Sequence, residues 1–487
     1  MKLTKPTRLP APAMPLLTRH DEYSMAHLIE RQIEFYQRDA DGDERTVALN
    51  PIFVRHFMKY RNSKLPVVTA IVTSPLVLPD GTLLATQGLD RKRGIIFRLQ
   101  PELITALPVP EDCTSSAVSA AMRFLTDVWL CDVSTDYAGK CIVIAAALTI
   151  LERVLLPERP AFFVTAGQRG GGKTTTLQML FVAATGYHAP AAAWSTSEEE
   201  RRKALFSYLS EGVAAVVWDN IPRGALISCP SIEKCLTALL YSDRVLGETG
   251  IRTVPATTVM LFTGNNIAPR GDLASRSLHV RLAVDRPDPE NRLYAHPDPI
   301  AWTINHRGNI LCALYTILLG NPRLRAQNPP PAETRFKTWW HLVGSAVEHA
   351  AKLAAEEAEW FVADKHPTCP ASKISFKAMF LDGEQDEEQT SALATVLDAL
   401  WSRWPNGFKA SHVSSYAGEA ETSAIEFKAA LEQAAGKLLP IITSTTVTWR
   451  LKALIDAPVL VGKHVLVLRY APDEAKNGGF FRVEPVP

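Results

Sequence analysis

This sequence of 487 residues has almost no excess of positive or negative charge, and its cysteines do not occur in closely spaced pairs. Its 52 Lys and Arg residues nearly balance 51 Asp and Glu residues, so the net charge is +1. No overall basic field therefore attracts nucleic acid, and any contact with DNA has to come from a local patch or a channel lining. The seven cysteines are scattered without a C-x-x-C pair, which argues against a structural zinc site and favours reduced thiols.

The sequence also has no apolar stretch long enough to cross a membrane as a helix. The longest apolar stretch, residues 141–150, is far shorter than the ~20 residues that a membrane-spanning helix needs. The N-terminal segment is broken by prolines and has no apolar signal-peptide core. We therefore expect a soluble, cytoplasmic protein that has no membrane partner and has room for about three domains.

The most specific feature that is present lies in residues 161–180. An apolar run ends in Gly167-x4-Gly172-Lys173-Thr174, and a helical pattern follows at once, which is the phosphate-binding loop in its strand–loop–helix context. Glycines let backbone N–H groups turn towards phosphates. Lys173 would reach the β- and γ-phosphates, and the Thr174 hydroxyl would bind Mg²⁺. The pattern predicts an ATPase with ATP and Mg²⁺ as cofactors, in which the nucleotide contacts Gly167, Gly170, Gly171, Gly172, Lys173, Thr174 and Thr175.

Strands and helices alternate from residue 161 to about 285, the pattern of an α/β core with a parallel sheet. We predict three domains around it. A mixed or β-rich N-terminal domain covers residues 1–110, and the ATPase domain with flanking helices covers 111–370. A C-terminal domain covers 371–487, and its acidic run at 382–388 is typical of a solvated linker.

Two further apolar strands end in polar residues. Residues 213–218 lead into Asp219, about 45 residues after Lys173, where a carboxylate would hold Mg²⁺ opposite the loop threonine. Residues 257–263 lead towards Asn265 and Asn266. From a strand beside the metal-binding strand, the Asn265 amide can hydrogen-bond the γ-phosphate and the attacking water. A plain Gly-Asn-Asn turn is the alternative.

Arg276 follows Asn265 by about ten residues, at the place where a ring ATPase presents an arginine finger to the nucleotide of its neighbour. The catalytic residues that the pattern predicts are therefore Asp219, Asn265 and Arg276, and the metal ligands are Thr174 and Asp219. Asn220 cannot act as a base. The acidic cluster 198–200 can supply one, or it is an ordinary acidic first turn of a helix capped by Ser195 or Ser197.

The order of these motifs resembles the helicase portion of the primase–helicases of plasmids, phages and genomic islands. These are AAA+ ring ATPases of the superfamily 3 or MCM-like kind. The resemblance covers residues 66 to 292, and its motifs lie at 70–81, 88–90, 218–220, 242–247, 263–266 and 289–292. Leu89 replaces the usual tyrosine and Asn220 the usual glutamate. No zinc ribbon or primase active site precedes these motifs here, so the resemblance does not support priming.

This resemblance implies a P-loop AAA+ core that forms a homo-oligomeric ring, expected to be a hexamer, with single-stranded and forked DNA as substrate. It also implies primase or replication-initiation proteins as partners. Residues 244–254 place short apolar pairs around Glu-Thr-Gly, a pattern that fits a β-hairpin. Relatives project such a hairpin into the ring channel, where Arg244 and Arg252 would grip the DNA backbone. An ordinary connection with solvated arginines is the alternative.

The C-terminal region predicts helices near 391–404, 409–416, 423–436 and 445–455, then a β pair (459–461 and 465–470) and a last strand at 480–483. This order suggests a winged helix. Its predicted recognition helix would carry Thr448, Arg450 and Lys452, and Lys463, His464 and Lys476 would lie near the wing. A protein-contacting domain with a solvated basic helix is the alternative.

Together these patterns predict an ATP-dependent, ring-forming DNA helicase of a mobile genetic element. Two other functions fit the same motifs. One is an AAA+ loader or remodelling ATPase that acts on a protein partner. The other is a DNA-binding replication initiator without unwinding activity.

Overall fold

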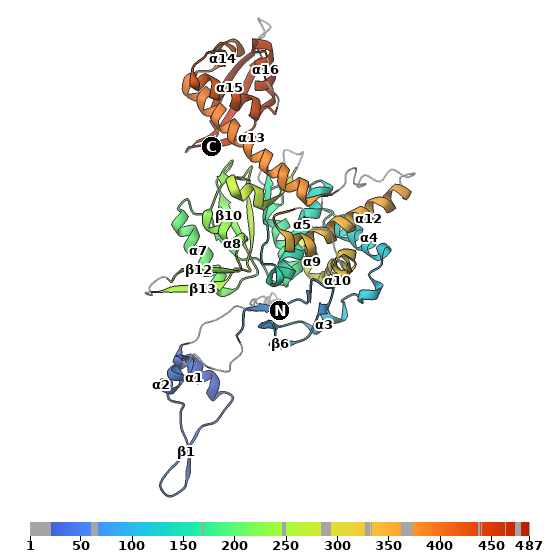
Figure 1. Cartoon of the computed structure of the whole chain (residues 1–487), viewed down its shortest axis with the longest axis vertical. Coiled ribbons are helices and arrows are strands. Elements are labelled where there is room, and N and C mark those ends of the chain that lie inside the picture. Colours follow the sequence, from blue (N-terminus) through green and yellow to red (C-terminus); the bar gives the residue numbers. More distant parts are fainter. Residues whose placement is uncertain are drawn as a thin grey trace, which may run out of the picture.

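The computed structural model describes residues 21–59, 67–167, 170–245, 250–283, 294–326, 332, 334–361, 374–436, 439, 441–462, 464–472 and 479–486. Figure 1 shows a central α/β body between a small N-terminal module and a C-terminal unit. The C-terminal unit lies against one end of the body, on the side opposite the N-terminal module (Figure 1).

A five-stranded sheet forms the centre of the body, in the order β16-β8-β14-β10-β9. Every neighbouring pair in it is parallel. The strands are β8 (Ala161–Ala166), β9 (Ala191–Ala193), β10 (Ala215–Ile221), β14 (Val259–Asn265) and β16 (Ser277–Leu282). β8 is buried along its whole length, as expected for a parallel sheet that is covered on both faces. The predicted α/β core with a parallel sheet is confirmed.

Helices cover both faces of this sheet. The largest apolar cluster lies on one face and includes α5 (Tyr137–Glu152), α6 (Lys173–Thr185), α10 (Arg307–Leu319) and α12 (Ser345–Phe361). A second cluster on the other face includes α7 (Glu198–Glu211) and α8 (Pro230–Leu236). The smaller helices of the body are α3 (Pro101–Thr105), α4 (Ser115–Arg123), α9 (Pro299–Asn305) and α11 (Lys337–Trp339).

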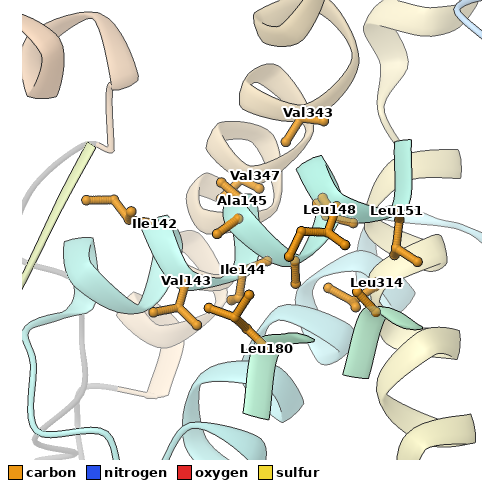
Figure 2. Close-up of a cluster of buried hydrophobic side chains, with 14 of the residues drawn as sticks. Ile142, Val143, Ile144, Ala145, Leu148, Leu151, Leu180, Leu314, Val343 and Val347 are labelled. Carbon is orange, nitrogen blue, oxygen red and sulfur yellow. The ribbon is translucent and has the colours of Figure 1, made fainter. Parts of the chain in front are cut away.

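The longest apolar run of the sequence is the core helix α5. In Figure 2 its side chains, among them Val143 and Leu148, meet Leu180 of α6, Leu314 of α10 and Val347 of α12. The helix is buried on nearly every side, which explains why its sequence shows no polar face. Among the residues that the structure describes, no helix is both long enough and apolar enough to cross a membrane.

Short strands precede the core as predicted. They are β3 (Ala70–Val72), β4 (Leu76–Val77), β5 (Leu83–Leu84), β6 (Gly88–Asp90) and β7 (Ile95–Phe97). These strands contribute to a small apolar cluster of their own. Val77 of β4 instead belongs to the largest cluster of the body. The Val77 amide donates to both carboxylate oxygens of the buried Glu152 at 3.0 and 3.1 Å. The Tyr315 hydroxyl donates to the Pro75 carbonyl at 2.7 Å. These contacts attach the β-rich segment to the body.

The N-terminal module consists of α1 (Glu22–Glu30), β1 (Tyr36–Arg38), β2 (Glu44–Thr46) and α2 (Pro51–Lys59). Among its apolar residues, Ala26 and Val54 are buried. Large apolar side chains of α2 lie at the surface, with Ile52 at 68% and Phe53 at 65% exposure.

The C-terminal unit combines helices with a four-stranded antiparallel sheet and has its own apolar core. Its helices are α13 (Phe376–Arg403), α14 (Ala410–Ala417), α15 (Thr422–Ala434) and α16 (Ser444–Ala453). Its strands, in sheet order, are β17 (Phe408–Lys409), β20 (Gly479–Val486), β19 (His464–Pro472) and β18 (Val459–Val461). The predicted helices, β pair and last strand are confirmed, and β17 is an additional strand.

The prediction of an acidic linker at 382–388 is wrong, because this run lies inside α13. The Ser375 side chain caps the start of the helix by accepting from the Ala378 amide. Phe380, before the run, packs in the largest cluster of the body, whereas Leu393 and Val396, after it, pack in the C-terminal core. One helix therefore bridges the two cores.

Candidate nucleotide site

The glycine-rich loop leaves β8 at its buried carboxyl end and runs directly into α6. Gly170 and Gly172 have φ angles of 75° and 83°, a left-handed backbone conformation that residues other than glycine rarely adopt. Gly172 is the N-cap of α6, and Lys173 is the first residue of this 13-residue helix. The backbone N–H groups and the helix dipole at such a terminus favour an anion. Gln168 and Arg169 lie outside the described residues.

Three neighbouring strands bring the predicted site residues together. β14 lies between β8 and β10, so Asn265 at the end of β14 stands between the glycine-rich loop and Asp219. The Lys173 ammonium donates to the Asn265 side-chain oxygen, with 2.7 Å between Nζ and Oδ1. Thr174 is exposed and Thr175 is half-buried at the start of α6. The residues thus converge at the carboxyl edge of the sheet, where ligands bind in open α/β folds.

Charge and burial act against each other at Lys173. Partial burial lowers the pKa of its ammonium, whereas the nearby Asp219 carboxylate raises it. The Asp219 side chain also accepts a hydrogen bond from the Asn220 amide at 2.7 Å. The Asp219 carboxylate therefore lies close enough to Lys173 to favour its charged form.

The residues after Asp219 and Asn265 both have left-handed backbones. The φ angles are 60° at Asn220 and 51° at Asn266, and asparagine tolerates this conformation better than most residues. The Asn266 amide donates to the Ala166 carbonyl at 3.1 Å, which ties the turn to the end of β8. Gly264 and Asn265 still belong to β14, and the chain bends at Asn266, so Asn265 contacts Lys173 from the end of the strand and not from the alternative Gly-Asn-Asn turn.

A cavity of about 210 Å³ opens beside the glycine-rich loop. It is lined by Gly171, Gly172, Thr175, Thr176 and Met179 of the loop and α6, and by Asp132, Val133, Tyr294, Pro297 and Pro299. The Asp132 carboxylate fixes this wall by accepting from the amides of Ala295 and His296, both at 2.8 Å. Cys131, Asp132 and His296 have possible metal-ligand atoms within 4.8 Å of one another. The hydrogen bonds of Asp132 to the amides of residues 295 and 296 explain this grouping without a metal ion.

The acidic cluster at 198–200 forms the first turn of α7. Ser197 caps this helix by accepting from the Glu200 amide. Glu198 accepts from Ser231 and pairs with Arg201, each at 2.7 Å, and Lys203 pairs with Glu199 and Glu200. These contacts agree with the interpretation of an ordinary acidic helix start.

Arg276 lies at the amino end of the parallel strands, whereas its own glycine-rich loop lies at their carboxyl end. It ends the 3₁₀ segment Gly271–Arg276 (η4), and the next residue, Ser277, pairs with Ala161 at the start of β8. The loop leaves the other end of β8, roughly 17 Å away at ~3.3 Å per residue. Arg276 donates to the Glu233 carbonyl at 2.6 Å and pairs with Asp272. The geometry therefore excludes a role at the nucleotide site of the same subunit in this conformation.

The predicted β-hairpin is confirmed. β12 (Leu240–Arg244) and β13 (Ile251–Pro255) pair antiparallel and project from the body in Figure 1. The two arginines point to opposite faces. In the strand register, Arg244 lies opposite Ile251 on the exposed face. Arg252 lies opposite the buried Asp243, on the other face. The tip at 246–249 lies outside the described residues.

The exposed face of α16 differs from the predicted one. Lys452 is exposed, with its Nζ 4.6 Å from the centre of the Tyr470 ring. Arg450 is half-buried, and its Nε is inaccessible to solvent. Trp449, which was not among the predicted site residues, is 70% exposed. Because polar residues surround Trp449 in the sequence, its exposure could have been predicted.

Near the predicted wing, His464 is exposed and its ring lies 5.1 Å from that of Trp401. Lys463 and Lys476 lie outside the described residues.

No protein-family model matches the chain, and no curated protein matches it significantly. The fold and the site define an α/β protein whose parallel five-stranded sheet is compatible with a P-loop type of core. The roles of its residues rest on the geometry given above.

Proposed function

We propose that the chain binds and hydrolyses ATP at the carboxyl edge of its central sheet. The observation that carries this proposal is the Lys173–Asn265 hydrogen bond beside Asp219, at the N-terminus of α6. Lys173 and the loop amides would bind the β- and γ-phosphates. Asn265 would orient the γ-phosphate and the attacking water. The cavity beside Gly172 and Thr175 would take the nucleoside.

Thr174 and Asp219 would hold Mg²⁺. A hydroxyl and a carboxylate are the hard oxygen donors that this ion prefers, and both side chains are accessible at the edge of the sheet. When bound, the ion would neutralise phosphate charge. Asn220 still cannot supply a base, because its amide does not take up a proton at neutral pH.

We further propose an AAA+ ring helicase that translocates on single-stranded DNA. The position of Arg276 at the far edge of the sheet favours action on the nucleotide of a neighbouring subunit. The projecting β12–β13 hairpin offers a DNA contact at Arg244. The helices and antiparallel strands of the C-terminal unit are consistent with a winged helix.

A loader or remodelling ATPase is the second candidate, and exposed apolar side chains favour it. Leu240 and Ile251 on the hairpin are 60% and 76% exposed, and Trp449 on α16 is 70% exposed. Such side chains suit a protein surface better than a phosphate backbone.

ATP turnover with and without single-stranded DNA separates these candidates. A helicase hydrolyses ATP, is stimulated by single-stranded DNA and unwinds a forked duplex. A loader hydrolyses ATP without this stimulation and responds to its protein partner. DNA binding without any turnover would contradict both and leave the initiator.

A further inference from the structure

The C-terminal unit meets the central body at the turn that follows Asp219. β18 is the edge strand of its sheet, and the Leu460 amide on this edge donates to the Gly224 carbonyl at 3.2 Å. The partly buried Leu460 side chain packs against the apolar cluster that contains Ile221 and Ala225. A strand of one unit is thus joined to the loop after the metal-binding strand of the other.

Gly224 also contacts the candidate nucleotide site. Its amide donates to the backbone carbonyl of Asn265 at 2.9 Å. Its φ angle is 70°, and a Cβ there would lie 3.3 Å from the Leu460 nitrogen and 3.4 Å from the Pro458 oxygen. Only glycine provides both the left-handed backbone and this close approach without strain.

The segments after Asp219 and Asn265 are held together beyond this turn. β11 (Leu226–Ile227) pairs in parallel with β15 (Ala268–Pro269). The Ala268 amide donates to the Ala225 carbonyl at 3.1 Å, and the Arg270 amide donates to the Ile227 carbonyl at 2.7 Å. The paired segments lead into η4, which α13 of the C-terminal unit contacts. The segment that follows Asn265 is therefore connected to a surface that the C-terminal unit contacts.

We propose that Gly224 is a positioning residue that couples the nucleotide site to the C-terminal unit. The connection runs from Lys173 through the side chain and carbonyl of Asn265 to Gly224 and then to Leu460 in β18. This inference rests on the proposed binding of nucleotide. A bound nucleotide would add partners to Lys173 and Asn265 and restrict them, so β18 becomes better ordered. By linkage, the position of the C-terminal unit alters the affinity for nucleotide in return.

Hydrogen–deuterium exchange of the amides of residues 459–461 in the full chain tests this coupling. Exchange is compared with and without Mg²⁺ and a non-hydrolysable ATP analogue, and calorimetry on the same samples measures nucleotide binding. In the wild type, the nucleotide should slow exchange in this segment by about tenfold. Lys173→Ala should abolish that response.

Gly224→Ala and Gly462→Ala form a matched pair. Gly462 has a similar φ of 58°, but nothing lies within 4 Å of the position of its Cβ. Gly224→Ala should lose the exchange response while nucleotide still binds, and Gly462→Ala should keep it.

Two results would overturn the coupling alone. One is nucleotide binding by the wild type with unchanged exchange at residues 459–461. The other is an equal loss of response in the Gly224→Ala and Gly462→Ala variants. Absence of nucleotide binding by the wild type is a different result, because it refutes the proposed function and the coupling together.

Discussion

Asp219 and Asn220 are adjacent at the end of β10, but only the first has the charge that a Mg²⁺ site requires. We expect Asp219→Asn to abolish ATP hydrolysis while much of the nucleotide affinity remains, because Lys173 and the loop amides still bind the phosphates. Turnover and nucleotide titration measure the two effects.

Asn220→Gly is the matched control, because glycine tolerates the φ of 60° at that position. This variant should retain most of the turnover. An active Asp219→Asn together with an inactive Asn220→Gly would mean that the metal-binding residue had been assigned wrongly.

His279 on β16 predicts a loss of stability in acid. Both of its ring nitrogens are buried without a hydrogen-bond partner in the part of the chain that the structure describes. Burial lowers the pKa of this imidazole to about 3, whereas an unfolded histidine titrates near ~6.5. The unfolded state therefore takes up a proton below ~6.5 that the folded state takes up only near pH 3. Stability should fall as the pH decreases through this interval.

Denaturant unfolding at pH 7.5 and pH 5 measures this effect. His279→Leu should lose less stability between the two pH values than the wild type, whereas His412→Leu, at an exposed position, should lose as much as the wild type. Equal losses in all three proteins would rule out His279 as the cause.

At the scale of elements, the hairpin makes a prediction that distinguishes its two arginines. Arg244 lies on the exposed face, whereas Arg252 lies on the face of Asp243, which pairs with Arg202 at 2.8 Å. Arg244→Ala should weaken single-stranded DNA binding and reduce the salt slope of the binding constant by about 1. Arg252→Ala should leave that slope unchanged. Equal slopes for Arg244→Ala and the wild type would remove the hairpin as a phosphate contact.

The core elements could be predicted because their patterns are local. β8, β10 and β14 are apolar runs; β8 leads into the glycine-rich loop with its fixed spacing, and β10 and β14 carry polar residues near their ends. The continuity of α13 could not be predicted, since its acidic run resembles a solvated linker and its apolar anchors, Phe380 and Leu393, pack in different cores. The sequence also could not predict that Arg244 and Arg252 lie on opposite faces of the hairpin, because this depends on the register of the two strands.

The Gly224–Leu460 contact lay further beyond the reach of the sequence. It joins residues of two units that are far apart along the chain, and it uses only backbone atoms, which leave no side-chain pattern. A glycine three residues after the end of a strand is typical of an ordinary turn. Its close approach to β18 became visible only in the three-dimensional arrangement.

At the scale of the whole molecule, Arg276 tests whether the site is completed by a second copy of the chain. It cannot reach its own glycine-rich loop, so Arg276→Ala subunits should bind ATP normally yet hydrolyse it ~10³-fold or more slowly. Mixing them with Lys173→Ala subunits should restore some turnover, because an intact loop from one variant then meets an intact arginine from the other.

Exchange of the two variants into common oligomers has to be shown first, for instance by native mass spectrometry. Mixed oligomers without any recovered activity would contradict a role of Arg276 in the neighbouring site. Arg281 and Arg292 would then be the next residues to test.

ATP turnover by purified wild-type protein and by Lys173→Ala tests the central claim most directly. The wild type should hydrolyse ATP in the presence of Mg²⁺. Lys173→Ala should fold normally, as judged by its circular dichroism, but show no turnover, because it lacks the ammonium that contacts Asn265 and would contact the phosphates. Turnover by Lys173→Ala at the wild-type rate would contradict the assignment of this edge of the sheet as the nucleotide site.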